Sequence, residues 1–124
     1  MNVNKELAEF IRSSPTAFHA VETVSKMLKE NGFIELYESE DWNLTSGNKY
    51  FTTRNGSSLI AFTLPKKIYS FAIAATHSDS PSFKIKENSE LRDSCYVKLS
   101  VERYGGMLCS SWLDRPLSIA GRIT

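Results

Sequence analysis

The first third of the chain places its hydrophobic residues at helical spacing. Leu7, Phe10 and Ile11 give residues 4–12 one apolar face, as in a short amphipathic helix. A second stripe with the same period consists of Ala17, Val21, Val24 and Leu28. The pattern therefore predicts two successive helices, each with one side available for packing on a core.

Residues that favour helix ends separate the two stripes. Ser13-Ser14-Pro15 ends the first helix, and we expect a serine there to cap the second helix, with Pro15 at its first position. Asn31-Gly32 supplies a left-handed C-terminal stop. His19 falls in the first turn of the second helix. A partly exposed or locally bonded histidine is expected there, because no second ligand type stands at helical spacing from it.

From residue 33 the pattern becomes that of β-strands. Residues 33–37 predict a short strand, and residues 49–53 and 58–63 predict a hairpin. Asn55-Gly56 lies between the two longer strands, and both residues tolerate the positive φ angles of a type I′ turn. Residues 38–41 are acidic and fit a solvated connection.

Residues 69–75 are apolar at successive positions, unlike the alternating strands. Such a run predicts a strand buried on both faces, as at the centre of a sheet covered by helices, with a short helix as the weaker alternative. Residues 82–86 and 95–103 alternate and predict half-exposed strands. Gly105-Gly106 permits a bend or a close backbone approach. Residues 120–124 resemble the start of another strand, so we expect the sequence to be part of a longer protein.

Composition narrows the class of protein. A chain of 124 residues with 41% hydrophobic and 23% charged residues can bury one core, and the order of helices and strands predicts an α/β fold. The formal net charge is only +1, so we expect no nucleic-acid partner. The longest apolar run is far below the roughly 18 residues that a membrane span needs. Cys95 and Cys109 come with no secretory signal, and we expect reduced thiols in a cytoplasmic protein.

His77 and Asp79 are the candidate functional residues. His77 follows the predicted buried strand, at the end where open α/β sheets place ligand-binding groups. A metal-bound imidazole needs its other N–H held by an acceptor, and Asp79 can be that acceptor. Alternatively, Asp79 opens a local turn and His77 is an ordinary histidine at a strand end. Ser78 and Ser80 stand too close to both residues to form a catalytic triad with them.

Five sequence blocks, taken in order, resemble the N-terminal part of the aspartyl aminopeptidase family. The blocks are residues 15–21, 53–62, 76–81, 101–106 and 112–122. Each block alone is modest, but five in family order are specific.

The resemblance implies an α/β metallopeptidase with two metal ions, usually zinc, which removes acidic N-terminal residues from peptides and assembles into large homo-oligomers. His77 then corresponds to a metal ligand and Asp79 to the catalytic-site carboxylate that orients it. Residues 1–88 correspond to the N-terminal part of a zinc-peptidase-type sheet flanked by helices. Residues 89–124 correspond to the start of an inserted, β-rich dimerisation domain.

The family pattern also marks what this sequence lacks. Family members are several times longer, and the bridging aspartate, the general-base glutamate and the remaining ligands come from beyond position 124. Cys109 and Pro116 stand where members often have a bulky residue and aspartate. One histidine and one aspartate cannot hold two ions, so we expect no activity from these residues alone. The alternatives are a non-catalytic module that binds other subunits, and an unrelated enzyme using His77 as general base.

Overall fold

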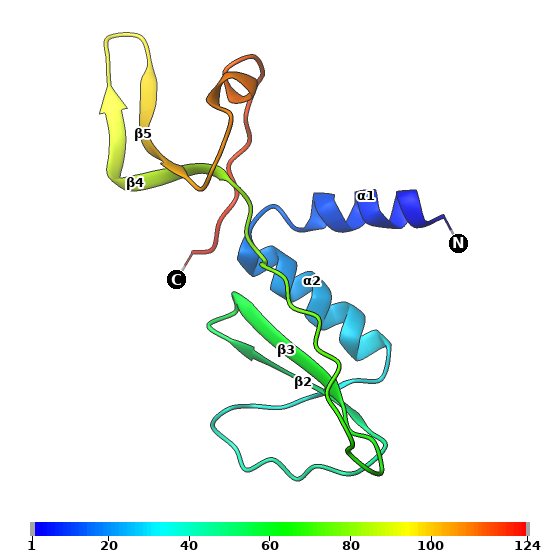
Figure 1. Ribbon diagram of the computed structural model, residues 1–124. Coiled ribbons are helices and arrows are strands. Elements are labelled where there is room, and N and C mark those ends of the chain that lie inside the picture. Colours follow the sequence, from blue (N-terminus) through cyan, green and yellow to red (C-terminus); the bar gives the residue numbers. More distant parts are fainter. Residues whose placement is uncertain (1, 124) are drawn as a thin grey trace. The chain divides into compact units, whose positions relative to one another are not determined.

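The computed structural model describes residues 2–123 and divides the chain into two compact units (Figure 1). Met1–Asp79 with Ala120–Thr124 form the first unit, and Ser80–Ile119 form the second. The first contains α1 (Val3–Ser13), α2 (Ala17–Glu30), β1 (Ile34–Glu35), β2 (Lys49–Arg54) and β3 (Ser58–Thr63). The second contains β4 (Ser82–Arg92), β5 (Val97–Tyr104) and the short 3-10 helix η1 (Cys109–Trp112). The α/β class is confirmed.

Both predicted helices form, but the second begins later than expected. Thr16 is its N-cap, and the threonine hydroxyl accepts a hydrogen bond from the backbone N–H of His19 at 3.4 Å. The prediction of a serine cap with Pro15 inside the helix is therefore wrong. Threonine caps almost as well as serine, and a helix that starts after Pro15 has no N–H to lose at that proline. Gly32, at φ 78°, follows the C-cap as predicted.

The sheet of the first unit has the strand order β1-β2-β3. β1 pairs with β2 in parallel over two residues, so the strand expected at residues 33–37 is shorter than predicted. β2 and β3 form the expected antiparallel hairpin. Asn55 and Gly56 have φ angles of 53° and 65°, and the Ser57 N–H donates to the Arg54 carbonyl at 3.2 Å. The Asn-Gly signal is confirmed, because two left-handed residues match the twist of a tight hairpin.

The core of the first unit lies where α2 packs against β2 and β3. Phe51 is fully buried, with Val21 and Tyr50 nearly so. Successive strand residues point to opposite faces, so Phe51 and Tyr50 are covered from different sides. The ammonium of Lys29, on α2, lies 5.9 Å from the centroid of the Phe51 ring. On the other side, the Tyr50 hydroxyl accepts the Thr45 N–H at 2.8 Å, which ties the preceding loop to the sheet.

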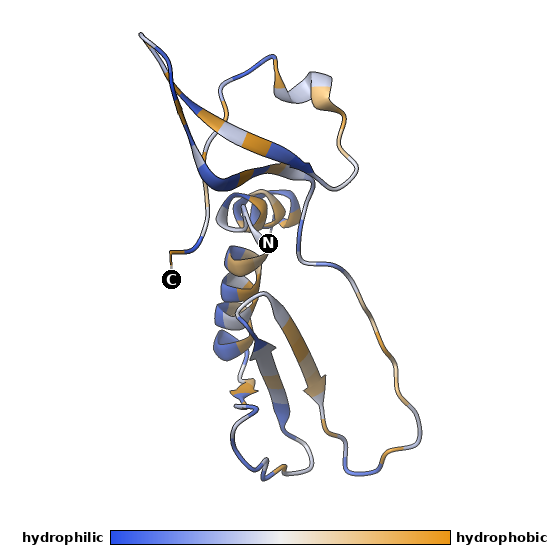
Figure 2. Cartoon of the chain, turned by 90° about the vertical axis from the view of Figure 1, so that its left-hand side faces the viewer, coloured by the Kyte–Doolittle hydropathy of each residue, from blue (hydrophilic) through white to orange (hydrophobic). Residues whose placement is uncertain are grey.

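Residues 69–75 do not form the predicted buried strand. They have no regular secondary structure, and the side chains of Tyr69, Phe71 and Ile73 are 86%, 81% and 85% exposed. Figure 2 shows this apolar segment as a coil that leaves the end of β3 and runs apart from the sheet. The prediction is wrong for the described chain, because a central strand exists only if neighbouring strands pair with it.

The second unit is built on the antiparallel hairpin of β4 and β5. β4 extends further than the predicted strand at residues 82–86, with an irregularity between Ile85 and Glu90. The register places Ile85 opposite Val101 and Lys84 opposite Glu102, so apolar residues pair with apolar ones and charged with charged at this end of the hairpin. The face that carries Phe83, Ile85, Val97, Leu99 and Val101 also carries the charged residues that pair with three of them, so the predicted separation into an apolar and a polar face is only partial.

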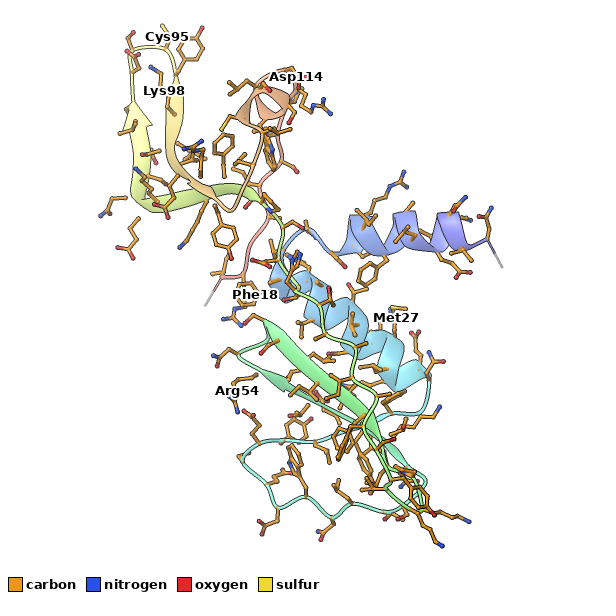
Figure 3. The ribbon with its side chains drawn as sticks, in the orientation of Figure 1. Phe18, Met27, Arg54, Cys95, Lys98 and Asp114 are labelled. Carbon is orange, nitrogen blue, oxygen red and sulfur yellow. The ribbon has the colours of Figure 1, made fainter. Side chains whose placement is uncertain are left out.

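Three contacts outside the ladder support the second unit. The Phe83 ring meets the Trp112 ring of η1 edge to face, at 5.6 Å between centroids. Gly105 has a φ of 76°, and a Cβ there would lie 3.4 Å from the Cα of Pro81. This is the close backbone approach that the glycine pair predicted. Figure 3 places Lys98 on β5, and its ammonium lies 2.9 Å from a carboxylate oxygen of Asp93.

The last described residues do not form the strand that their sequence suggested. Residues 120–123 are irregular and return to the first unit. The Arg122 guanidinium lies 4.1 Å from the centroid of Phe18, at the start of α2 (Figure 3), and donates to the Asn55 carbonyl at 3.0 Å. None of the helices between residues 2 and 123 has the length and apolar character needed to cross a membrane.

Candidate metal site

The candidate site lies at the end of the apolar segment, in the first unit. His77 and Asp79 sit in an irregular stretch that follows residues 69–75. The His77 side chain is 78% exposed and that of Asp79 is 42% exposed. The two side chains meet directly, as the His-x-Asp spacing predicts, and the imidazole remains open to solvent.

The hydrogen bonds of His77 fix its tautomer. Its Nδ1 lies 2.8 Å from the Asp79 backbone carbonyl oxygen and 3.0 Å from the Asp79 carboxylate Oδ1. A carbonyl oxygen and an ionised carboxylate can only accept, so Nδ1 carries the proton. In the neutral ring, Nε2 then keeps its lone pair. Within residues 2–123 no hydrogen bond engages Nε2, and this is the nitrogen that a metal ion would use.

The residue between them anchors the loop to the sheet. The Ser78 hydroxyl donates to the Ser57 backbone carbonyl at 2.9 Å, across 21 positions of sequence. Ser57 belongs to the turn between β2 and β3, whose conformation is fixed by Asn55 and Gly56. The Ser78 contact therefore holds the His77 loop against the turn of the β2–β3 hairpin. Nothing in the sequence pattern connected these two serines, because their contact depends on the course of the chain after β3.

His77 and Asp79 can supply one metal ligand and the carboxylate that supports it. Among residues 2–123, no three or more His, Cys, Asp or Glu side chains are grouped so that they could hold a metal ion. His19, the other histidine, is bonded locally, with its Nδ1 2.8 Å from the Thr16 hydroxyl. The expectation of a locally bonded His19 is confirmed. Cys95 and Cys109 are free thiols, as expected of reduced cysteines.

Two carboxylates with a lowered pKa lie away from His77 in the sequence. Hydrogen bonds from the Arg54 guanidinium lower the pKa of Glu38, and the two side chains meet at 2.6–3.0 Å. The neighbouring Arg115 in the same way lowers the pKa of Asp114. Both pairs are exposed, and exposed ion pairs of this kind support local structure.

The sequence comparisons point to one family over almost the whole chain. The sequence model described as aminopeptidase I zinc metalloprotease (M18) matches residues 10–124. The "Probable M18 family aminopeptidase 2" of Clostridium novyi is 47% identical over 123 residues, covering 96% of this chain and 28% of the relative. The "Aspartyl aminopeptidase 1" of Schizosaccharomyces pombe is 42% identical, covering 95% of this chain and 26% of the relative.

Solved structures agree in fold. A chain from the cryo-EM structure of the Ape4 and Nbr1 complex superposes with a TM-score of 0.83 at 41% identity, covering 86% of this chain and 21% of its own. Chaetomium thermophilum mApe1 superposes with a TM-score of 0.81 at 36% identity, covering 87% of this chain and 26% of its own. A chain of the S. cerevesiae mApe1 dodecamer gives a TM-score of 0.75 at 31% identity, covering 92% of this chain and 28% of its own.

The chain thus spans about a quarter to three tenths of the length of the curated relatives it matches. The matched residues 10–124 include the end of α1, all of α2, the three-stranded sheet, the His77 loop and the β4–β5 hairpin. Sequence and fold agree across this region, and they identify the chain as a member of the aminopeptidase I zinc metalloprotease (M18) family.

Proposed function

We propose that His77 and Asp79 form part of the active site of a zinc-dependent aminopeptidase that removes acidic residues from the N-termini of peptides. The observation that carries this proposal is the bond between His77 Nδ1 and the Asp79 carboxylate, which leaves Nε2 with its lone pair. The zinc family description supports the metal. The aspartyl aminopeptidase names of the fission-yeast and Ricinus communis relatives support the substrate class.

Each residue of the loop has a distinct role in this proposal. His77 donates one Nε2 ligand, Asp79 holds the imidazole in the correct tautomer and raises its basicity, and Ser78 fixes the loop on the hairpin turn. Zinc, when bound, supplies a Lewis acid that polarises the scissile carbonyl and lowers the pKa of bound water. The proposed two-ion site needs further carboxylate and imidazole ligands, which residues 2–123 do not group around His77.

The proposed assembly is a homo-oligomer. One solved relative is described as a dodecamer, and the apolar face of the β4–β5 hairpin leaves Val97, Leu99 and Val101 partly exposed. A two-stranded hairpin is barely stable alone, so this face is expected to be covered in an assembly. The hairpin belongs to the unit Ser80–Ile119, which overlaps residues 89–124, the part that we assign to the start of a dimerisation domain next to the peptidase part at residues 1–88. The cytoplasmic location and the absence of a nucleic-acid partner stay predictions.

A metal-binding and activity experiment tests the proposed site. The chain is co-expressed with the part of the Clostridium novyi relative that it does not cover, and zinc content and hydrolysis of an aspartyl chromogenic substrate are measured. We expect turnover from the combination and none from the chain alone. Asp79→Ala should lower zinc affinity about 10–100-fold, as loss of such a supporting carboxylate does elsewhere. His77→Ala should remove a ligand and abolish turnover.

His19→Ala is the matched control, because His19 is bonded to Thr16 rather than poised for a metal. It should leave zinc content and turnover unchanged. Full activity of His77→Ala would contradict the proposed ligand role. Turnover by the chain alone would contradict the conclusion that the site needs further ligands. A stable chain that binds relatives without supporting turnover would favour the second candidate, a non-catalytic module for subunit interaction, which the partly exposed β4–β5 face supports.

A further inference from the structure

The first unit contains two Asn-Gly pairs, and the surroundings of the two pairs differ. Asn31-Gly32 follows the end of α2, and Asn55-Gly56 forms the turn between β2 and β3. Asparagine loses its side-chain amide most readily in front of glycine, because glycine has no Cβ to hinder attack of its backbone nitrogen on the asparagine side chain. Both asparagines are exposed, so exposure alone does not distinguish the two pairs.

Hydrogen bonds engage both reacting groups of Asn31-Gly32. The Gly32 N–H donates to the Lys29 carbonyl at 3.1 Å. The side-chain amide of Asn31 donates to the Met27 carbonyl at 2.8 Å. Both bonds must break before the Gly32 nitrogen can reach the Asn31 side chain. Because each broken bond raises the free energy of the reacting conformation, this pair is protected from deamidation.

The reacting groups of Asn55-Gly56 are not engaged in this way. Among residues 2–123, no hydrogen bond uses the Gly56 N–H or the Asn55 side chain. The contact of this pair is made by the peptide oxygen, since Arg122 Nη1 donates to the Asn55 carbonyl at 3.0 Å. The guanidinium is itself held 4.1 Å from the centroid of the Phe18 ring. The peptide between Asn55 and Gly56 therefore has a cation on its oxygen and a free N–H.

We propose that Asn55 is a site of spontaneous deamidation and that Arg122 directs the product to isoaspartate. Solvent removes the proton of the Gly56 N–H, and the guanidinium stabilises the negative charge that the nitrogen shares with the Asn55 carbonyl oxygen. The Gly56 nitrogen then attacks Asn55 Cγ. The bond from Cγ to Nδ2 breaks, and Nδ2 takes a proton from solvent and leaves as ammonia. The product is a five-membered succinimide ring.

Water then opens this ring at one of its two carbonyls. Addition at Cγ breaks the new bond to the Gly56 nitrogen and gives aspartate. Addition at the original backbone carbonyl carbon breaks the original peptide bond and gives isoaspartate. Arg122 polarises this second carbonyl and stabilises the oxyanion that forms on it. The oxygen that Arg122 contacts in the structure becomes a carboxylate oxygen of isoaspartate, so the product retains a charge-assisted hydrogen bond.

The isoaspartyl form has one more methylene in the main chain of the turn. Ser57, the residue after the pair, provides the carbonyl that accepts the Ser78 hydroxyl. We expect the longer turn to displace this carbonyl and to loosen the His77 loop. The proposal concerns the chemistry of the turn and does not rest on zinc binding or on peptidase activity.

Ageing of the purified chain at mildly alkaline pH tests the site. Peptide mapping by mass spectrometry follows each asparagine, and electron-transfer fragmentation distinguishes aspartate from isoaspartate. We expect Asn55 to convert at least ~10-fold faster than Asn31, whose two hydrogen bonds must break first. A synthetic peptide of residues 50–60, aged in parallel, gives the product ratio without Arg122. The ratio of isoaspartate to aspartate should be about 3-fold higher in the chain, as expected for one exposed charge interaction.

Variants of Arg122 test the role of the guanidinium. Arg122→Ala should lower the product ratio at Asn55 to that of the free peptide. Arg122→Lys keeps a cation and should retain part of the difference. Lys26→Ala removes an exposed cation further along α2 and is the matched control, with an unchanged ratio. A role of Arg122 in holding the turn alone would change the rate at Asn55 and leave the product ratio unchanged.

Hydrogen exchange tests the link from the turn to the His77 loop. The isoaspartyl fraction of the aged chain is separated by ion-exchange chromatography. Exchange of the amides at residues 76–79 should rise ~2–10-fold in this fraction, the equivalent of one lost hydrogen bond. Asn55→Asp is the matched control, because it carries the same new charge on an ordinary main chain. Its exchange at residues 76–79 should equal that of the unmodified chain.

Four results would overturn parts of the proposal. Equal conversion of Asn31 and Asn55 would contradict a selective site, and so would an Asn55 that stays intact while the free peptide converts. The same product ratio in Arg122→Ala and in the unmodified chain would contradict the role of Arg122. An isoaspartyl fraction with unchanged exchange at residues 76–79 would contradict the link to the His77 loop.

Discussion

The hydroxyl of Ser78 donates a hydrogen bond of 2.9 Å to the backbone carbonyl of Ser57. The bond joins the His77 loop to the turn of the β2–β3 hairpin, across a stretch of chain that consists of β3 and the irregular residues 64–77. A net gain of about 0.5–1.5 kcal/mol is typical of such a bond. The Ser78 hydroxyl thus helps to position the loop that carries His77.

Ser78→Ala should loosen the loop without unfolding the unit. We expect exchange of the amides at residues 76–79 to rise about 2–10-fold, the equivalent of one lost hydrogen bond, while the β2 and β3 amides are unchanged. Hydrogen exchange read by mass spectrometry measures both. Ser80→Ala, two residues further on, is the matched control. Equal exchange in the two variants would show that the Ser57 contact does not hold the loop.

Arg122 and Phe18 should be coupled in stability. The guanidinium stacks 4.1 Å from the ring centroid and also donates to the Asn55 carbonyl. A double-mutant cycle with Arg122→Ala and Phe18→Leu should give a coupling of about 0.5–1 kcal/mol in the free energy of unfolding. Arg122→Lys should retain little of this coupling energy, because a lysine ammonium lacks the planar face and the several N–H donors of a guanidinium.

Urea denaturation of the four proteins in this cycle supplies the coupling energy. Lys26→Ala, exposed two turns further along α2, serves in a second cycle with Phe18→Leu. That control cycle should show additivity. A coupling near zero in the Arg122 cycle would mean that the last residues of the chain pack on α2 without a specific ring contact.

Thr52→Val should stabilise the first unit. The Thr52 side chain is 7% exposed, and its hydroxyl has no hydrogen-bond partner within the described chain. Valine has nearly the same shape and leaves no buried polar atom unpaired. We expect a gain of about 1 kcal/mol, seen as a higher midpoint in thermal unfolding followed by circular dichroism. Thr53→Val, on the less buried neighbour, should change the midpoint less, and a destabilised Thr52→Val would point to a partner for the hydroxyl.

The Glu38–Arg54 pair should make stability depend on acidic pH. Hydrogen bonding from Arg54 lowers the pKa of Glu38 in the folded state. The unfolded state therefore takes up its proton first as the pH falls. The stability from this pair is present above the ordinary glutamate pKa, about 4.3, and is lost as the pH falls through the lower folded value. Figure 3 shows Arg54 at the end of β2, where the carboxylate meets it.

Urea midpoints between pH 6 and pH 3 measure this dependence. Glu38→Gln should flatten the acidic limb, because the variant has no proton to gain at that position. Glu40→Gln, in the same connection, should retain the slope of the unmodified chain. An unchanged slope in Glu38→Gln would assign the acid sensitivity to other carboxylates, of which Asp93 is the next candidate, because its pKa is lowered by Lys98.

The parts that local chemistry specifies were predicted from the sequence. The two helices, the left-handed stop at Gly32 and the Asn55-Gly56 hairpin depend on contacts within a few residues, so their patterns were sufficient. The pairing of His77 with Asp79 was predictable for the same reason. The helix cap was misplaced by two residues, from Ser14 to Thr16, since both side chains can accept from the first turn of a helix and only the position at which the helix begins selects one.

The tertiary structure decided what depends on distant partners. The apolar residues 69–75 have the composition of a central strand, yet a strand requires hydrogen bonds from neighbours, and residues 2–123 supply none. The links from Ser78 to Ser57 and from Arg122 to Phe18 also lie outside any local pattern, because each joins positions far apart in the chain. The sequence by itself determined the helices, the hairpins and a histidine with its carboxylate. The course of the chain determined how that histidine is held and which strand edges stay open.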